Sequence, residues 1–196
     1  MKSLWARLCA VLMVTALCAG GALAQAVERE GVKFEPTAQV GGAALQLNGT
    51  GVRTRAIFKV YAAGLYVPQK ADSAAALLSQ KGPRRLSMTM LRNVDADSFA
   101  GPLNEGLRNN HTEAQVAAFK PQIDAMNAAL KAIEEAKKGD VLHFEYLPDS
   151  GTRITVNGQQ KGANIPGEDF FAAMLRIWLG DKPADADLKK GLLGAS

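Results

Sequence analysis

The chain has 196 residues, of which 47% are apolar and 21% are charged, and its formal net charge is +4. No cluster of Lys and Arg marks the basic face that nucleic-acid recognition requires, so this class of function is excluded. The chain has no internal repeat, linker or low-complexity segment, and its length predicts one domain with a sizeable core.

The start of the chain has the pattern of a secretory signal peptide. Lys2 and Arg7 precede an apolar run over residues 8–19, which is shorter than the roughly 20 residues of a membrane span. Small residues stand at Ala22 and Ala24, the two positions that signal peptidase reads. We therefore expect cleavage after Ala24 and a periplasmic or secreted protein.

The predicted division is a signal peptide over residues 1–24 and one domain over residues 25–196. Cys9 and Cys18 leave with the signal peptide, so the domain has neither a thiol nor a disulfide. Two basic residues leave as well, and the formal charge falls from +4 to +2. No second apolar stretch is long enough to be transmembrane.

The first part of the domain has strand patterns separated by turn residues. Val32 and Phe34 alternate with polar residues, as do Leu45 and Leu47. The strongest pattern is the run over residues 53–67, RTRAIFKVYAAGLYV, which is rich in β-branched and aromatic residues and predicts one long strand. Gly64 within it indicates a bulge or a close backbone approach.

The rest of the chain alternates between helices and strands. Thr112 and Gln115 have the spacing of a capping box, and Pro121 predicts a kink or a break. Asn157-Gly158 is a hairpin turn sequence. The helices are expected over residues 72–78, 95–110, 112–138, 166–179 and 184–193, and the strands over residues 85–91, 141–147, 152–156 and 159–163. Hairpins dominate this order, which predicts an α+β domain with a largely antiparallel β-sheet covered by helices.

The usual marks of metal and cofactor chemistry are missing. His111 and His143 are the two histidines and lack the spacing of metal ligands, so neither a metal site nor a cofactor is predicted. No serine stands in the pattern of an activated nucleophile, and the glycine pairs lack the context of a phosphate-binding loop.

One group of residues is a candidate anion site. In an extended strand, Arg53, Arg55 and Tyr61 share one face, whereas Tyr66 lies on the other face unless a bulge intervenes. A guanidinium can bind a carboxylate through two parallel hydrogen bonds, and a phenol can add a third. The alternative is that both arginines face solvent.

Three segments resemble the chalcone isomerase-like family, in its bacterial, exported branch. They are GTGVRTRAIFKVYAAGLYVPQKA from Gly49, NGQQKGANIPGEDFFAAMLRIWLGDKP from Asn157, and LKKGLLG from Leu188. The resemblance implies an antiparallel sheet with helices on one side and a ligand cleft between the two. It also implies two kinds of activity, because some members cyclise chalcones and others bind fatty acids without catalysis.

The resemblance places several family positions on this chain. The arginine of the family's GVR motif corresponds to Arg53, with Arg55 as a competitor because the following segment is shorter here. A threonine of the enzymes is replaced by Tyr61, Asn104 falls in the region of a family asparagine, and the helix around it has no tyrosine.

Binding is therefore the first hypothesis: Arg53 or Arg55 pairs with the head of a small amphipathic anion such as a fatty acid, and Tyr61 or Tyr66 donates a hydrogen bond. The second is an isomerase (intramolecular lyase) acting on a chalcone-like aromatic substrate, in which Tyr61 or Asn104 replaces the missing hydroxyls. The third is a structural or partner-binding role in the cell envelope, with exposed aromatics near Trp178 as the interface. For these aromatics, the spacing of Phe170, Met174 and Trp178 favours the alternative of a buried helix face.

Overall fold

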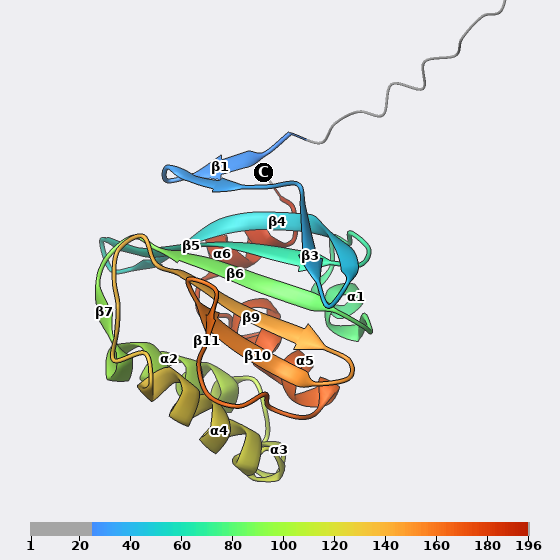
Figure 1. Ribbon diagram of the computed structural model, residues 1–196, viewed down its shortest axis with the longest axis vertical. Helices are drawn as coiled ribbons and strands as arrows, with labels where there is room; N and C mark the ends of the chain where they lie inside the picture. Colours follow the sequence, from blue (N-terminus) through green and yellow to red (C-terminus); the bar gives the residue numbers. More distant parts are fainter. Residues whose placement is uncertain (1–24, 196) are drawn as a thin grey trace, which may run out of the picture.

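A seven-stranded antiparallel sheet forms the centre of the structure, a computed structural model in which residues 25–195 are described (Figure 1). The strand order is β11-β10-β9-β6-β5-β4-β3. These strands are β3 (Thr37–Val40), β4 (Ala43–Arg55), β5 (Phe58–Val67), β6 (Arg84–Met90), β9 (Val141–Leu147), β10 (Gly151–Val156) and β11 (Gln159–Gln160). Two short ladders stand apart from the sheet, β1 (Val27–Arg29) with β2 (Val32–Phe34), and β7 (Val94–Asp95) with β8 (Glu135–Ala136).

Six helices in the described residues cover one face of the sheet, five of them through buried core residues and α3 through its contacts with α2 and α4, which confirms the predicted α+β class. They are α1 (Ala74–Ser79), α2 (Ala96–Asn109), α3 (Glu113–Ala118), α4 (Lys120–Lys131), α5 (Glu168–Leu179) and α6 (Ala186–Leu192). Among residues 25–195, no helix combines the length and the apolarity needed to cross a bilayer. The predicted signal peptide lies outside the described residues.

Side-chain caps fix where several helices begin. Asp95 caps α2 by accepting a hydrogen bond from the Ser98 N–H. The predicted capping box between Thr112 and Gln115 is present at the start of α3. The break expected at Pro121 is also present, because the helical segment is divided at Phe119 into α3 and α4. The expected end near residue 138 is wrong, however, since α4 ends at Lys131.

The predicted single strand over residues 53–67 is also wrong, because the chain reverses within it. β4 ends at Arg55, Ala56 and Ile57 form a two-residue turn, and β5 begins at Phe58. Ala56 has a φ of 53°, a left-handed conformation that only tertiary context selects for alanine. Nothing in the local residue types marks this turn, since it contains no Gly, Asn or Pro.

The hairpin register has two irregularities, and neither lies at Gly64. One is at Asn48 in β4 and the other at Val60 in β5. Gly64 is instead the site of a close approach, because a Cβ there would lie 2.7 Å from the ring of Phe34. As a result, Arg53 and Tyr61 lie directly opposite each other on neighbouring strands rather than along one strand.

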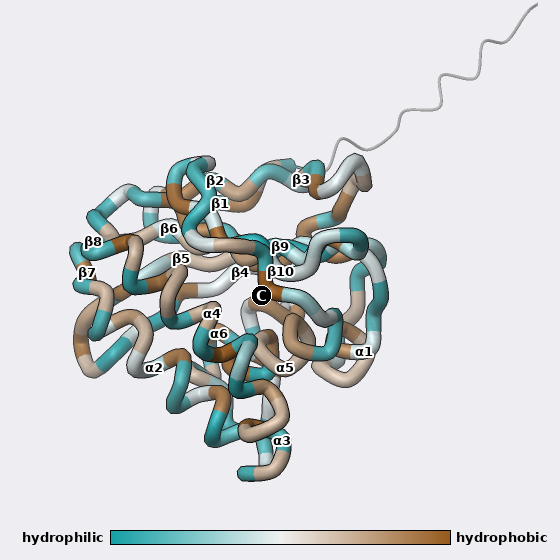
Figure 2. Tube along the Cα trace, turned by 60° about the horizontal axis from the view of Figure 1, so that its bottom comes forward, coloured by the Kyte–Doolittle hydropathy of each residue, from teal (hydrophilic) through white to brown (hydrophobic). Residues whose placement is uncertain are grey.

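Apolar side chains fill the space between the sheet and the helices, and α5 is buried along most of its length. The helices alternate between hydrophilic and hydrophobic colours in Figure 2, as expected when one face of each packs on a core. A smaller apolar cluster that includes Phe34, Leu47 and Tyr66 lies on the other sheet face, beneath the β1–β2 hairpin.

The sheet is curled, so that its edge strand folds back over the face away from the helices. The Arg85 guanidinium in β6 donates a hydrogen bond to the Gln39 carbonyl of β3 over 3.0 Å, although two strands separate β6 from β3. The same guanidinium pairs with Glu145 of β9. This polar contact ties the edge strand to the middle of the sheet.

Candidate functional site

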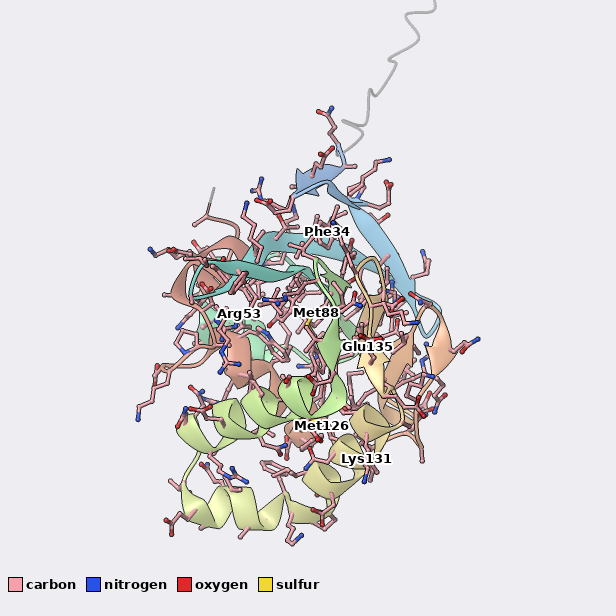
Figure 3. The ribbon with its side chains drawn as sticks, turned by 90° about the vertical axis from the view of Figure 1, so that its left-hand side faces the viewer. Phe34, Arg53, Met88, Met126, Lys131 and Glu135 are labelled. Carbon is pink, nitrogen blue, oxygen red and sulfur yellow. The ribbon has the colours of Figure 1, made fainter. Side chains whose placement is uncertain are left out.

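An open cavity of about 410 Å³ lies between the end of the β4–β5 hairpin and helix α2. The hairpin contributes Arg53, Arg55, Ala56, Phe58, Val60 and Tyr61, and the segment before α2 contributes Arg92, Asn93, Val94 and Asp95. Helices α2 and α5 contribute Ser98, Phe99, Pro102, Leu103 and Ile177, and the connection between α5 and α6 contributes Ala184. Figure 3 views the molecule from this end and shows Arg53 between the sheet and α2.

The lining separates into an apolar wall and a cationic mouth. Phe99, Leu103 and Ile177 belong to the buried core and form part of the wall. The charged lining residues are three arginines and Asp95. The carboxylate of Asp95 is engaged by the α2 cap, and the hydrogen bonds from Ser98 hold its pKa below the usual value. The excess of guanidinium groups favours an anion at the mouth.

Arg53 is the most enclosed of these arginines, with 20% of its side chain exposed. Its Nη1 donates to the Thr54 carbonyl over 2.8 Å and lies 3.7 Å from Oδ2 of Asp185. Within the described part of the chain these contacts involve Nη1 alone, so Nε and Nη2 remain as donors for a ligand.

Asp185 belongs to the cap of α6 and positions Arg53 from the helix side. Its Oδ1 accepts from the Asp187 and Leu188 N–H groups at 2.9 and 3.0 Å, and its Oδ2 accepts from the Thr54 N–H at 2.9 Å. Burial raises the pKa of this carboxyl, but the hydrogen bonds and the Arg53 charge outweigh burial and lower it overall. The carboxylate therefore stays ionised beside Arg53.

Tyr61 lies opposite Arg53 and is 94% buried, with 6% exposed. Its hydroxyl oxygen accepts a hydrogen bond from Nε1 of Trp178 over 2.8 Å. Burial raises the pKa of the phenol to about 12, so it keeps its proton at neutral pH. Because the indole donates to the phenol oxygen, the phenol proton is available to a ligand acceptor.

Arg55 also lines the cavity but is exposed at the end of β4. The sequence left open whether Arg53 or Arg55 faces the cleft, and the structure places both at it. The two side chains differ in exposure, since Arg53 is largely buried beside Asp185 and Arg55 is exposed at the rim of the cavity.

Two of the sequence-predicted site residues lie elsewhere. Tyr66 points to the face of the sheet away from the helices, and its hydroxyl donates to the Glu35 carbonyl over 3.1 Å. Asn104 lies on a side of α2 that does not line the cavity of Arg53. Its side-chain amide donates to Asn127 over 2.7 Å, and it lines a second open cavity among α2, α3 and α4. Neither residue therefore lies beside Arg53 in this structure, because strand alternation places Tyr66 on the other sheet face and Asn104 lies on another side of α2.

Three residues that line or support the candidate site had no sequence pattern that related them to Arg53 and Tyr61. Arg92 lies in a segment between a strand and a helix, where no local pattern relates it to Arg53. Asp185 was predicted near a helix start, but its pairing with Arg53 was not. Trp178 was assigned to a buried helix face, and the need of a buried indole N–H for an acceptor was the available signal.

Among the described residues, no group of three His, Cys, Asp or Glu side chains lies close enough together to hold a metal ion. The polar side chains that line the cavity carry guanidinium, phenol, carboxylate, amide and hydroxyl groups.

A family model described as chalcone isomerase-like matches residues 26–194. Among solved structures, the chain is similar to a fatty-acid binding protein of Arabidopsis thaliana, with a TM-score of 0.67 and 13% sequence identity over 86% of this chain and 96% of that chain. At this identity the likeness concerns the fold, which is the expected open-faced arrangement of sheet and helices. No curated protein sequence matches the chain.

Proposed function

The chain belongs to the chalcone isomerase-like family, and on this premise we propose that it binds a small amphipathic carboxylate such as a fatty acid without transforming it. The carboxylate would lie at the mouth of the cavity between the β4–β5 hairpin and α2. The hydrocarbon tail would extend along the apolar wall.

The observation that carries this proposal is the cross-strand pair of Arg53 and Tyr61. Arg53 has Nε and Nη2 available on one edge of its guanidinium, which is the arrangement that grips a carboxylate through two bonds. Tyr61 stands opposite with a phenol proton to donate. The Asp185 carboxylate holds Arg53 in place on its other side.

The apolar wall and the size of the cavity support an amphipathic ligand. About 410 Å³ lies within the range of small-molecule sites, and such sites combine apolar walls with a few polar anchors. The similar Arabidopsis protein is a fatty-acid binding protein, which supports the same ligand class here. The leader pattern of residues 1–24 supports export, and we propose that the binding takes place in the periplasm or outside the cell.

The phenol of Tyr61 argues for binding rather than for catalysis by this residue. With its pKa raised to about 12, the phenol is a hydrogen-bond donor and not a general base near neutral pH. A base matched to proton abstraction would need a pKa near the working pH.

Titration calorimetry with a medium-chain fatty acid tests the proposal. Wild-type protein should bind, and Arg53→Ala should weaken the affinity about 10- to 100-fold, the scale of a lost hydrogen bond to a charged group. Arg176→Ala is the matched control, because Arg176 is exposed on α5 and does not line the cavity. Equal affinities of wild type and Arg53→Ala would contradict the proposal that Arg53 binds the carboxylate.

A chalcone absorbance assay tests the non-catalytic part of the proposal. We expect the protein to leave the spontaneous cyclisation rate of a chalcone unchanged. Acceleration that Arg53→Ala abolishes would instead identify the same cavity as the site of an intramolecular lyase.

A further inference from the structure

The turn between β4 and β5 exposes two consecutive large apolar side chains. Ile57 is 85% exposed and Phe58 is 52% exposed, and they are the exposed large hydrophobic residues in the described part of the chain. Single exposed apolar residues are common on soluble proteins, but two at the tip of a projecting hairpin are a feature of interaction sites.

Basic side chains flank this tip on both strands and on the neighbouring segment. Arg55 and Lys59 are exposed on either side of the turn. The Arg92 guanidinium lies 4.6 Å from the centre of the Phe58 ring, in the geometry of a cation–π contact. Lys59 pairs with Glu30 over 2.7 Å, whereas Arg55 and Arg92 have no carboxylate within salt-bridge distance among the described residues.

The tip and the mouth of the cavity are at the same end of the molecule. Phe58, Arg55 and Arg92 line the cavity and also belong to the tip surface. Figure 1 shows the β4–β5 turn and β7 together at the left-hand end, with α1 at the opposite end of β5. A surface that touched the tip would therefore adjoin the cavity opening.

We propose that the β4–β5 tip docks the protein on the surface of an anionic lipid bilayer, with Ile57 and Phe58 in the interfacial region and Arg55 and Arg92 among the headgroups. Docking there would present the cavity mouth to the lipids. The docked protein could then exchange an amphipathic ligand with the bilayer, and this role of the contact rests on the proposed function. The docking itself does not depend on it.

The physical basis is the combination of apolar and basic groups in one projecting turn. Interfacial binding grows with buried apolar area and with attraction to anionic lipids. Each basic residue near an anionic surface contributes about 5-fold in affinity, and this part weakens as salt screens the charges. The Arg92–Phe58 contact keeps a guanidinium close to the apolar tip, as in amphipathic anchors that place apolar and basic groups side by side.

Vesicle flotation tests the proposal with the form that begins at Gln25, which contains every described helix and strand. Wild-type protein should float with phosphatidylcholine vesicles that contain phosphatidylglycerol, and much less with phosphatidylcholine alone or at high salt. Ile57→Ser should weaken this binding about 10-fold, because it removes an apolar side chain that would enter the interface. Ile57→Trp should strengthen it.

The control pair is Ala75→Ser and Ala75→Trp, which place the same new side chains on the exposed surface of α1 at the other end of β5 and should leave flotation unchanged. Ile57 is outside the lining of the cavity, so its variants should bind the fatty acid in solution as wild type does. Flotation without fatty-acid binding would contradict the proposed function alone.

The docking proposal is overturned if wild type does not float with anionic vesicles, or if Ile57→Ser floats as well as wild type. Fatty-acid binding without flotation would contradict the docking alone. Self-association in sedimentation velocity that Ile57→Ser abolishes, with no flotation, would identify the tip as a contact between two copies of the chain and would also overturn the proposal.

Discussion

At the scale of single residues, the buried hydrogen bond from Trp178 to Tyr61 joins the stability of the core to the chemistry of the cavity. The indole of Trp178 is 1% exposed and donates to the phenol over 2.8 Å. This bond satisfies a buried N–H and at the same time leaves the phenol proton for a ligand. One residue pair therefore serves both the fold and the candidate site.

Tyr61→Phe should affect both properties. It leaves the Trp178 N–H without its acceptor, so we expect urea denaturation to show a loss of about 1–3 kcal/mol in the free energy of unfolding. Calorimetry should show weaker binding of the fatty acid. Tyr66→Phe is the matched control, because it removes a phenol that bonds Glu35 on the opposite face. Unchanged affinity of Tyr61→Phe would exclude the phenol from the ligand site.

Asp185→Asn should separate cap stability from the charge balance at Arg53. The amide oxygen can still accept from the helix N–H groups, but the negative charge 3.7 Å from Arg53 Nη1 is removed. We expect the affinity for a carboxylate ligand to rise about 2- to 5-fold, the scale of a partly exposed ion pair. The free energy of unfolding should fall by about 1 kcal/mol, since the Thr54 N–H loses a charged acceptor. A weaker affinity would show that Asp185 acts mainly by holding Arg53 in place.

At the scale of elements, α6 is seated on β4 through a contact between two backbones. A Cβ on Gly49 would lie 2.1 Å from the carbonyl oxygen of Gly191, and a Cβ on Gly191 would lie 2.3 Å from that of Thr50. The Asn48 amide donates to the Leu192 carbonyl over 2.7 Å beside this contact. Close packing here brings the α6 cap, and with it Asp185, up to Arg53.

Gly191→Ala should disturb this seating. The added methyl group meets backbone atoms that cannot rotate away, and we expect a loss of at least about 1–3 kcal/mol in the free energy of unfolding together with weaker ligand binding. Gly101→Ala is a sharp control, because a Cβ at Gly101 on α2 meets nothing within 4 Å. That variant should be neutral or up to about 1 kcal/mol more stable. A tolerated Gly191→Ala would show that α6 can shift without cost.

At the scale of the whole molecule, a buried charge cluster on the curled face of the sheet links stability to pH. Glu145 has 2% of its side chain exposed and pairs with Arg85 and Arg153 across three neighbouring strands. His143 lies 3.9 Å from Glu145 with 24% of its side chain exposed. Burial is the main cause that lowers the pKa of His143 to about 4. The charges of Arg85 and Arg153 lower it further, and the charge of Glu145 opposes them.

His143 should make the folded protein less stable in mild acid. In the unfolded chain the histidine protonates near pH 6.5, whereas in the folded state it stays neutral down to about pH 4. The unfolded state therefore binds more protons between these values, and the free energy of unfolding falls as pH drops through this window, by up to about 3 kcal/mol. Urea denaturation at pH 7.5 and pH 4.5 measures the loss.

His143→Gln should remove most of that pH dependence. The pH dependence that remains in this variant belongs to carboxylates such as Glu145. Burial raises the pKa of Glu145, but its bonds to Arg153 and Arg85 outweigh burial and lower the pKa overall. The stabilisation by Glu145 is therefore lost only as pH falls further, through the folded pKa. Equal slopes for wild type and His143→Gln between pH 6.5 and 4 would show that His143 is not the responsible group.

The agreement between the elements predicted from the sequence and those of the structure differs from one element to another. Helices with an explicit start signal were predicted well, as at Asp95 and at the Thr112 capping box, because a cap is satisfied within four residues. The strand over residues 141–147 was likewise readable from its own alternation. The turn at Ala56 and Ile57 was not, because no residue there prefers a turn and the reversal is selected by pairing along the full length of β4 and β5.

The sequence by itself determined the α+β class, most helix starts and the absence of thiols from residues 25–196, and it predicted an anion site from Arg53 or Arg55 with Tyr61 or Tyr66. These follow from periodicity, caps, composition and family resemblance, all of which are carried by neighbouring residues or by whole segments. Only the tertiary structure decided that Arg53 and Tyr61 meet across a hairpin, that Tyr66 and Asn104 lie elsewhere, and that Asp185 and Arg92 join the site. The reason is physical: those relations depend on register, strand face and contacts between residues as far apart as Arg53 and Asp185, which no local preference encodes.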